Sequence, residues 1–124
     1  MLRHMMTHNE IESYALAKKG VEKMYPFDKK TAVFKVGNKM FLLYNDESEV
    51  VSLNLKCDPI YALELRSLYK SVIPGFHMSK KHWNTVTCNK EVEDVLIKEW
   101  IDDSYELVFT SLTKKLQNEI TLKG

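Results

Sequence analysis

The stretch that decides the fold is TAVFKVGNKMFLLYNDESEVVSLNLK, from Thr31 to Lys56. Apolar and polar residues alternate before Gly37-Asn38, a dipeptide typical of tight hairpin turns, and a largely apolar strand pattern follows it. A second turn signal at residues 45–48 leads into another alternating run. The pattern predicts a three-stranded antiparallel meander with one face buried. The other face is expected to present Lys35, Ser52, Asn54 and Lys56.

Helical patterns flank this meander. Asn9, with Glu12 three residues further on, has the form of a capping box and predicts the start of an amphipathic helix that Gly20 ends. Asp58-Pro59 predicts a second helix start, because the carboxylate accepts hydrogen bonds from free backbone N–H groups and proline has no N–H to leave unpaired there.

The rest of the chain adds one strand and further helices. Residues 83–88 alternate like a strand, and the C-terminal part is helical, with an apolar stripe that shifts at residues 102–104. The shift predicts a kink or two consecutive helices. The element order indicates an α+β fold with two layers, an antiparallel sheet with helices packed on one face. We expect residues 1–8 to be a flexible leader and residues 9–124 to form a single domain.

Composition excludes several classes of protein. The 124 residues are 44% hydrophobic and 28% charged, which is close to the average for globular proteins and unlike disordered or fibrous chains. The apolar runs are too short to cross a bilayer, so a cytoplasmic location without membrane contact is expected. Cys57 and Cys88 do not have the spacing of a zinc ribbon or a redox CxxC, and are expected to be free thiols inside the fold.

Charge is segregated along the chain although the formal net charge is only +1. The stretch from Arg66 to Lys90 contains no Asp or Glu, whereas the stretch from Glu91 to Glu106 is strongly acidic. Such segregation can create a one-sided electrostatic field, or simply two solvated faces of opposite sign.

Five segments of the chain resemble the MmcQ/YjbR family, small bacterial proteins often described as DNA-binding. They cover nearly the whole chain after residue 8, although the family's central motif often has Tyr where this chain has Phe76. The resemblance implies a compact α/β domain of the kind compared with frataxin-like and secretion-chaperone-like folds, and it implies DNA binding. The segments are YPFD (25–28), VFKVGNKMF (33–41), LNLKCDP (53–59), VIPGFHMSKKHWNTV (72–86) and IDDSYELV (101–108).

The basic segment PGFHMSKKHWNTV, residues 74–86, is the candidate binding surface. We predict that it binds double-stranded DNA with low sequence specificity, because lysines neutralise phosphates whatever the sequence and an aromatic ring can stack on a base. If the Pro-Gly turn holds the segment rigidly and Gly75 has a positive φ, a β-branched residue in place of Gly75 should weaken binding without removing a charge. Lys80, Lys81 and His82 are predicted to carry the binding, with Lys56, His77, Trp83 and Asn84 extending the surface. The plainer interpretation is that the lysines are only solvated and that Trp83 belongs to the core.

Two other functions are alternatives to DNA binding. A protein-interaction or chaperone-like module would use the open face or edge of the sheet, with anchors at Phe76, Met78, Tyr44 and Trp83. An enzyme would need His77 or His82 to act with Asp58 or Cys88, but none of them lies in a nucleophile elbow or a Gly-rich phosphate loop. We therefore expect a binding protein that is not an enzyme and uses no cofactor or metal.

Overall fold

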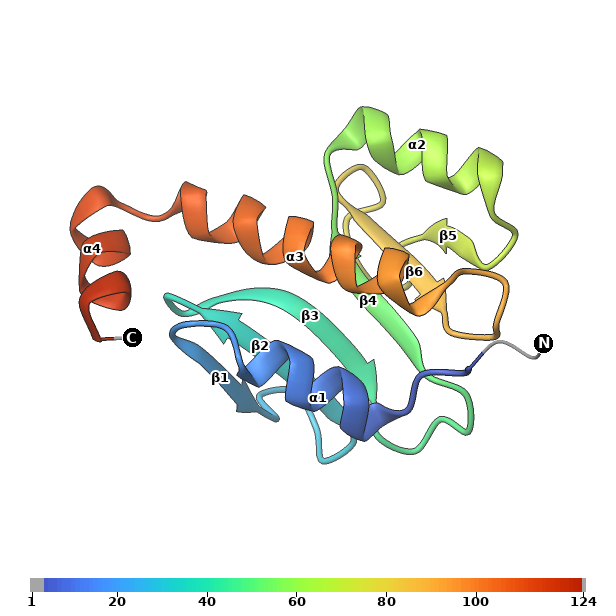
Figure 1. Cartoon of the computed structure of the whole chain (residues 1–124), viewed down its shortest axis with the longest axis horizontal. Coiled ribbons are helices and arrows are strands. Elements are labelled where there is room, and N and C mark those ends of the chain that lie inside the picture. Colours follow the sequence, from blue (N-terminus) through green and yellow to red (C-terminus); the bar gives the residue numbers. More distant parts are fainter. Residues whose placement is uncertain (1–3, 124) are drawn as a thin grey trace.

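The computed structural model describes residues 4–123, in which four helices and six strands form two layers (Figure 1). The elements are α1 (His8–Leu16), β1 (Val21–Met24), β2 (Thr31–Val36), β3 (Lys39–Asn45), β4 (Ser52–Lys56), α2 (Pro59–Leu68), β5 (Val72–Pro74), β6 (Trp83–Thr87), α3 (Asp94–Ser111) and α4 (Lys114–Lys123). None of the helices in this part of the chain has the length and apolar character needed to span a bilayer.

The predicted meander forms the centre of the sheet. All neighbouring strands are antiparallel, in the order β1-β2-β3-β4-β6-β5. Gly37 and Asn38 both have a positive φ, 56° and 67°, as a two-residue hairpin of this type requires. Two short edge strands, β1 and β5, were not predicted, and they extend the meander and β6 to six strands.

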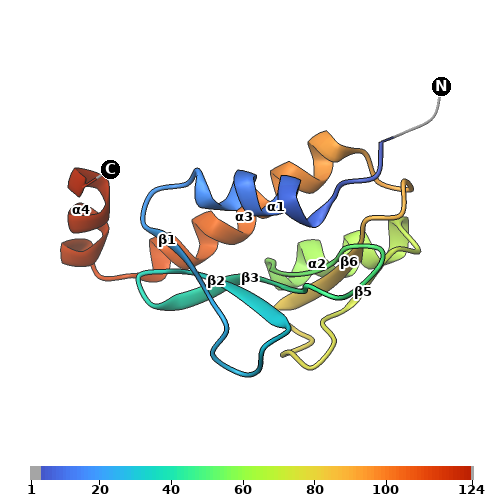
Figure 2. The same ribbon diagram turned by 90° about the horizontal axis from the view of Figure 1, so that it is seen from below.

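The two faces of the sheet are covered differently, as Figure 2 shows. α1 and α3 lie on one face, where Phe34, Leu42 and Leu53 join Ile97 and Ile101 in the main core. Within residues 4–123, the opposite face has no helix over it and carries a smaller buried cluster of Val33, Leu43 and Trp83. The α+β prediction, with helices on one face of an antiparallel sheet, is confirmed.

The first helix begins earlier than predicted. Thr7, not Asn9, is its N-cap, and Thr7 and Glu10 form the capping box through reciprocal side-chain-to-backbone hydrogen bonds. Met6, placed by the prediction in a flexible leader, is buried in the main core. The prediction for residues 4–8 is therefore wrong, and residues 1–3 lie outside the described part of the chain.

The third helix does not break at residues 102–104. α3 runs without interruption through Ser104, which is fully buried and is not a helix cap. Its hydroxyl donates to the carbonyl of Phe41 in β3 and accepts from the backbone N–H of Lys56 in β4. The helix ends instead at Ser111, with Leu112 as its C-cap, and the Thr113 hydroxyl accepts a hydrogen bond from the N–H of Leu116 at the start of α4.

Candidate functional site

A groove of about 730 Å³ opens on the helix-free face of the sheet. Its floor includes Met40 and Leu43 from β3, Asn54 from β4 and Thr85 from β6. Two loops, residues 25–30 after β1 and residues 75–82 after β5, contribute its walls and extend from this face in Figure 2. The groove thus lies on the open sheet face named in the protein-interaction hypothesis, and loop 25–30 is the part of its lining that was not predicted.

Loop 75–82 is tied to β6 by backbone hydrogen bonds. The N–H of Gly75 donates to the carbonyl of Trp83 at 2.8 Å, and the N–H of Phe76 donates to Oγ1 of Thr85 at 2.9 Å. The N–H groups of His82 and Trp83 both donate to the carbonyl of Ser79, which closes the basic end of the loop into a turn. These bonds order the loop before any ligand binds, which lowers the entropic cost of binding.

Arg66 of α2 holds the same loop from outside. Its Nε donates to Oδ1 of Asn84 at 2.6 Å, and its Nη2 donates to the carbonyls of Lys80 and Trp83. The forked guanidinium joins β6 and the loop in one network. Arg66 belongs to the basic stretch of the sequence, but its Nε and Nη2 donors are used within the fold.

Gly75 is required by close packing, not by a left-handed backbone. It is not among the residues with positive φ in the described chain, so the condition attached to the Gly75 substitution is not met. A Cβ at this position would lie 2.7 Å from Cβ of Trp83 and 3.0 Å from its carbonyl oxygen. The loop residue with positive φ is His77, at 61°, and its ring lies 4.1 Å from the Phe76 ring.

Three basic side chains predicted to lead binding are on the surface of loop 75–82. Lys80, Lys81 and His82 are all exposed, and the Lys80 ammonium donates to the carbonyl of Gly75 at 3.0 Å. An ammonium has three donors, so this bond leaves Lys80 able to contact an anion. Lys56 is half-buried at the end of β4, where it pairs with Trp83 in the β4–β6 ladder.

Two of the predicted site residues are not accessible. Trp83 is 8% exposed and packs in the cluster beneath the groove, so its ring cannot serve as a stacking surface for a base. Asn84 is 2% exposed and is bonded to Arg66 and to the carbonyl of Ala62. Tyr44, an anchor in the protein-interaction hypothesis, is also buried. The DNA-binding prediction is therefore wrong for Trp83 and Asn84, and the protein-interaction prediction is wrong for Trp83 and Tyr44. Strand alternation directs these side chains into the interior on one or the other face of the sheet.

Loop 25–30 is held by its own carboxylate. Asp28 accepts hydrogen bonds from the backbone N–H groups of Thr31 and Lys30, at 2.7 and 2.8 Å, and these bonds hold the pKa of its carboxyl below the ordinary value. The Tyr25 hydroxyl donates to Asp46, and Lys30 forms an exposed ion pair with Glu47 at 3.2 Å.

The second loop could have been found by comparing two short stretches of sequence. YPFDKK, residues 25–30, and PGFHMSKK, residues 74–81, both contain Pro, Phe and a Lys pair in that order. The structure brings them to one groove, where Phe27 and Phe76 are 65% and 63% exposed. Only the second stretch was predicted to act, and Phe27, Lys29 and Lys30 were missed.

Two residues of the enzyme hypothesis, Asp58 and Cys88, have structural roles in the fold. Asp58 caps α2 by accepting from the N–H groups of Ile60 and Tyr61, whereas Cys88 is buried. Both cysteines are free, and burial raises the pKa of the Cys57 thiol to about 11 and of the Cys88 thiol to about 12. Neither is therefore an activated nucleophile at neutral pH. Within residues 4–123, no three His, Cys, Asp or Glu side chains are grouped to hold a metal ion.

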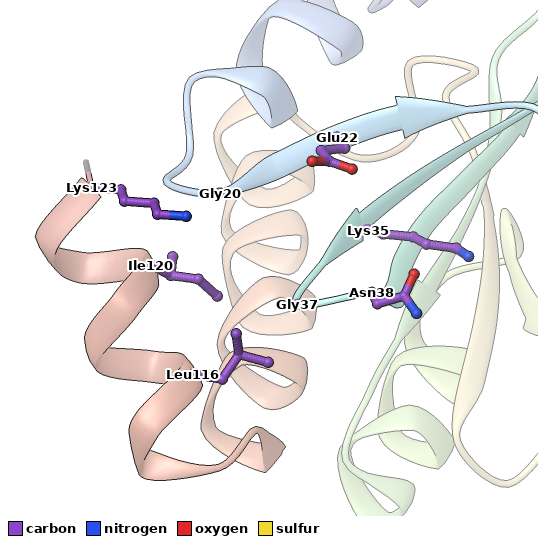
Figure 3. Close-up of a pocket in the computed structure, with 8 residues that line it drawn as sticks. All are labelled: Gly20, Glu22, Lys35, Gly37, Asn38, Leu116, Ile120 and Lys123. Atoms are coloured by element: carbon purple, nitrogen blue, oxygen red, sulfur yellow. The ribbon is translucent and has the colours of Figure 1, made fainter.

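A second hollow, of about 460 Å³, lies between α4 and the β1–β2–β3 edge of the sheet (Figure 3). It is lined by Gly20, Glu22, Lys35, Gly37, Asn38, Leu116, Ile120 and Lys123. A Cβ at Gly20 would lie 2.8 Å from Ile120, and one at Gly37 would lie 2.5 Å from Leu112, so both glycines let the C-terminal residues approach the sheet. The hollow is explained by the docking of α4.

Comparisons with known proteins identify the family. The family model described as YjbR matches residues 16–107. The chain belongs to the YjbR family. The family resemblance predicted from sequence is thereby confirmed, and the match includes both loops and the groove but ends before α4.

Relatives of this YjbR-family chain match it over most of their length. The chain is 37% identical to uncharacterized protein YbdF of Escherichia coli O157:H7 over 113 residues, covering 91% of this chain and 93% of the relative. It is 32% identical to uncharacterized protein YjbR of Escherichia coli K12 over 101 residues, covering 82% and 86%.

Solved structures share the fold. A crystal structure of a Deinococcus radiodurans protein, described by its DUF419 domain, has a TM-score of 0.89 and 35% identity, covering 94% of this chain and 89% of that one. A Pseudomonas syringae protein has a TM-score of 0.72 and 27% identity, covering 83% and 99%.

Proposed function

We propose that this protein binds double-stranded DNA with low sequence specificity, acting in the cytoplasm and without catalysis. The observation that carries the proposal is the pre-ordered basic turn of loop 75–82, which exposes Lys80, Lys81 and His82 together. Held lysines lose less conformational freedom on contacting phosphates than lysines on a mobile segment. Contacts to phosphates set affinity without reading base sequence.

Charge around this turn supports the proposal. From Arg66 to Lys90 the sequence has no acidic residue, so the lysine charges there are not offset by a carboxylate of the same segment. His77 and Lys56 extend the polar surface beside the turn, whereas the buried Trp83 and Asn84 support the loop from beneath. The binding surface is therefore smaller than the sequence predicted.

The test is fluorescence anisotropy of a labelled duplex of about 20 base pairs at several salt concentrations. Wild-type protein is expected to lose affinity steeply as salt rises. Lys80→Ala/Lys81→Ala should show a slope shallower by about 0.9 for each phosphate that the variant no longer neutralises. The matched control is Lys114→Ala/Lys115→Ala, which removes another exposed lysine pair, on α4. No binding at low salt, or equal slopes for both double variants, would reject the proposal.

A protein partner is the second candidate, and the apolar lining of the groove favours it. Phe27, Met40, Leu43, Phe76 and Met78 offer side chains that an apolar segment could contact. Such a complex should tolerate salt concentrations that remove a phosphate-bound ligand, because screening acts on charges. Salt-resistant binding that the lysine variants leave unchanged would therefore favour this candidate over DNA.

A further inference from the structure

The groove between the two loops has a lining unlike that of a phosphate site. Among the described residues, those that line it include no Lys or Arg. Its one carboxylate, Asp28, already accepts hydrogen bonds from its own loop. The floor at Met40 and Leu43 is apolar. A ligand inside the groove would therefore present an uncharged, largely apolar group.

An exposed aromatic ring stands on each loop. Phe27 and Phe76 both line the groove, and each keeps more than three-fifths of its surface in water. The backbone of Phe76 is held by its N–H, which donates to Thr85, and the residues that follow Phe27 are held by the bond from the Lys30 N–H to Asp28. Aromatic rings held out of the core on ordered loops are available to stack on a planar group.

The floor also supplies neutral polar groups. The Thr85 hydroxyl donates to Oδ1 of Asn54 and accepts from the N–H of Phe76. Within residues 4–123, neither N–H of the Asn54 amide donates a hydrogen bond, and Ser52 adds a hydroxyl to the lining. Amide donors and hydroxyls suit the edge of a heterocycle, which offers both acceptors and donors.

We propose that the groove holds an unpaired base of single-stranded nucleic acid, stacked on Phe27 and Phe76, while its phosphates lie on Lys80 and Lys81 outside the groove. This inference rests on the nucleic-acid binding proposed above. It adds a preference for strands whose bases are free, since a duplex keeps its base faces stacked on one another and a single strand exposes them.

Charge complementarity favours this ligand over an apolar protein segment. The groove lies beside the turn of Lys80, Lys81 and His82, in a stretch of sequence without acidic residues. A nucleotide combines a planar base with an adjacent phosphate, and so matches both the apolar floor of the groove and the basic turn. An apolar peptide would match only the groove.

The experiment compares three labelled oligonucleotides by anisotropy, each over the same salt series. They are a single strand, its duplex, and the same single strand with abasic residues at its centre. The intact single strand is expected to bind about tenfold more tightly than the abasic strand, because each base stacked on an aromatic ring contributes measurably to affinity. The salt slopes of these two strands should be equal, because their phosphates are unchanged.

Phe27→Ala and Phe76→Ala are each expected to lose about tenfold in affinity for the intact strand, with the salt slope and the abasic strand's affinity unchanged. Phe76→Tyr keeps the aromatic ring, so it should bind the intact strand as tightly as the wild type does, unlike Phe76→Ala. Leu122→Ala on α4 is the matched control, because it removes an apolar side chain that is 85% exposed and outside the groove.

The outcomes separate the two proposals. If duplex and intact single strand bind equally, or the abasic strand binds as well as the intact one, base capture is wrong while DNA binding stands. If neither DNA form binds at low salt, the proposed function fails and base capture fails with it. A loss on Phe76→Ala that Phe76→Tyr does not repair would also overturn the stacking role.

Discussion

Loops 25–30 and 75–82 contain the same types of residue but differ in electrostatic surroundings. Lys29 and Lys30 follow Asp28 in the sequence, and Lys30 is paired with Glu47 and bonded through its carbonyl to the N–H of Asp46. Lys80 and Lys81 lie in a stretch without acidic residues. A lysine pair therefore attracts phosphate only when its neighbours leave the charge unbalanced, and this depends on the fold as much as on the pair.

The loops also differ in how they are held. Loop 75–82 is joined to α2 through Arg66 and to β6 through backbone bonds, so several elements must move for it to move. Loop 25–30 depends on Asp28 within the loop and on Tyr25 bonded to Asp46. We expect the basic loop to be the stiffer of the two.

The strongest test of this difference is removal of Arg66. Arg66→Ala is expected to lower the free energy of unfolding by about 2–3 kcal/mol, because a charged donor is removed and the buried Asn84 keeps an unpaired acceptor. Urea denaturation measures the change. Arg66→Lys keeps the positive charge but not the forked guanidinium, so its free energy of unfolding should lie between those of the wild type and Arg66→Ala.

The matching change on the other loop is Tyr25→Phe, which removes only the bond to Asp46 and should cost about 1 kcal/mol or less. Equal losses for Arg66→Ala and Tyr25→Phe would show that the two loops are held alike.

Gly75→Ala tests the close approach of the basic loop to β6. The added Cβ meets Cβ and the carbonyl of Trp83, so the backbone must shift, and we expect a loss of about 1–3 kcal/mol. The folded variant should also bind DNA less tightly although no charge has changed. Ser79→Ala, an exposed position on the same loop, is the control. Unchanged stability and affinity in Gly75→Ala would mean that the loop adapts freely.

Glu47→Gln should leave the Lys30 charge of loop 25–30 without a paired carboxylate, as the lysine charges of loop 75–82 are within the described chain. Freeing Lys30 from its exposed ion pair is expected to raise DNA affinity about two- to fivefold, consistent with the modest strength of surface pairs. Anisotropy at low salt measures the gain, and Glu119→Gln on α4 removes the same charge elsewhere. A gain of the same size in both variants would point to net charge alone.

Acid pH should loosen only one of the loops. The folded pKa of Asp28 is lowered, so its contribution to stability is present above the ordinary Asp value of about 3.9 and disappears as pH falls through the folded pKa. The amide resonance of Thr31 should therefore shift with a midpoint below that value, while the amide of Gly75, bonded to a carbonyl, should not. An NMR titration in which Thr31 shifts at the ordinary value would contradict the strength of these hydrogen bonds.

The sequence predicted those parts of the fold that local signals encode. Gly37-Asn38 set the hairpin, and Asp58-Pro59 set the start of α2, as found. β1 was missed because its register with β2, Val21 opposite Val36, is set by tertiary pairing and its four residues show no clear alternation. β5 was missed because it ends in a proline, which only an edge strand tolerates.

The exposure of the basic turn could be predicted for the same reason. Lys80, Lys81 and His82 are consecutive, and exposure of a turn follows from its composition. The partnership of Phe27 with Phe76 was not predicted, because it depends on two loops emerging from one face of a sheet whose strand order is not local.

The two tryptophans lie on opposite faces of the sheet, Trp83 in the cluster under the groove and Trp100 in the helical core. They are the only two in the chain. Their emission should therefore report separately on the two layers of the molecule. In a Trp100→Phe variant, the remaining indole would be a built-in fluorophore whose spectrum responds when the groove is occupied, without any attached label.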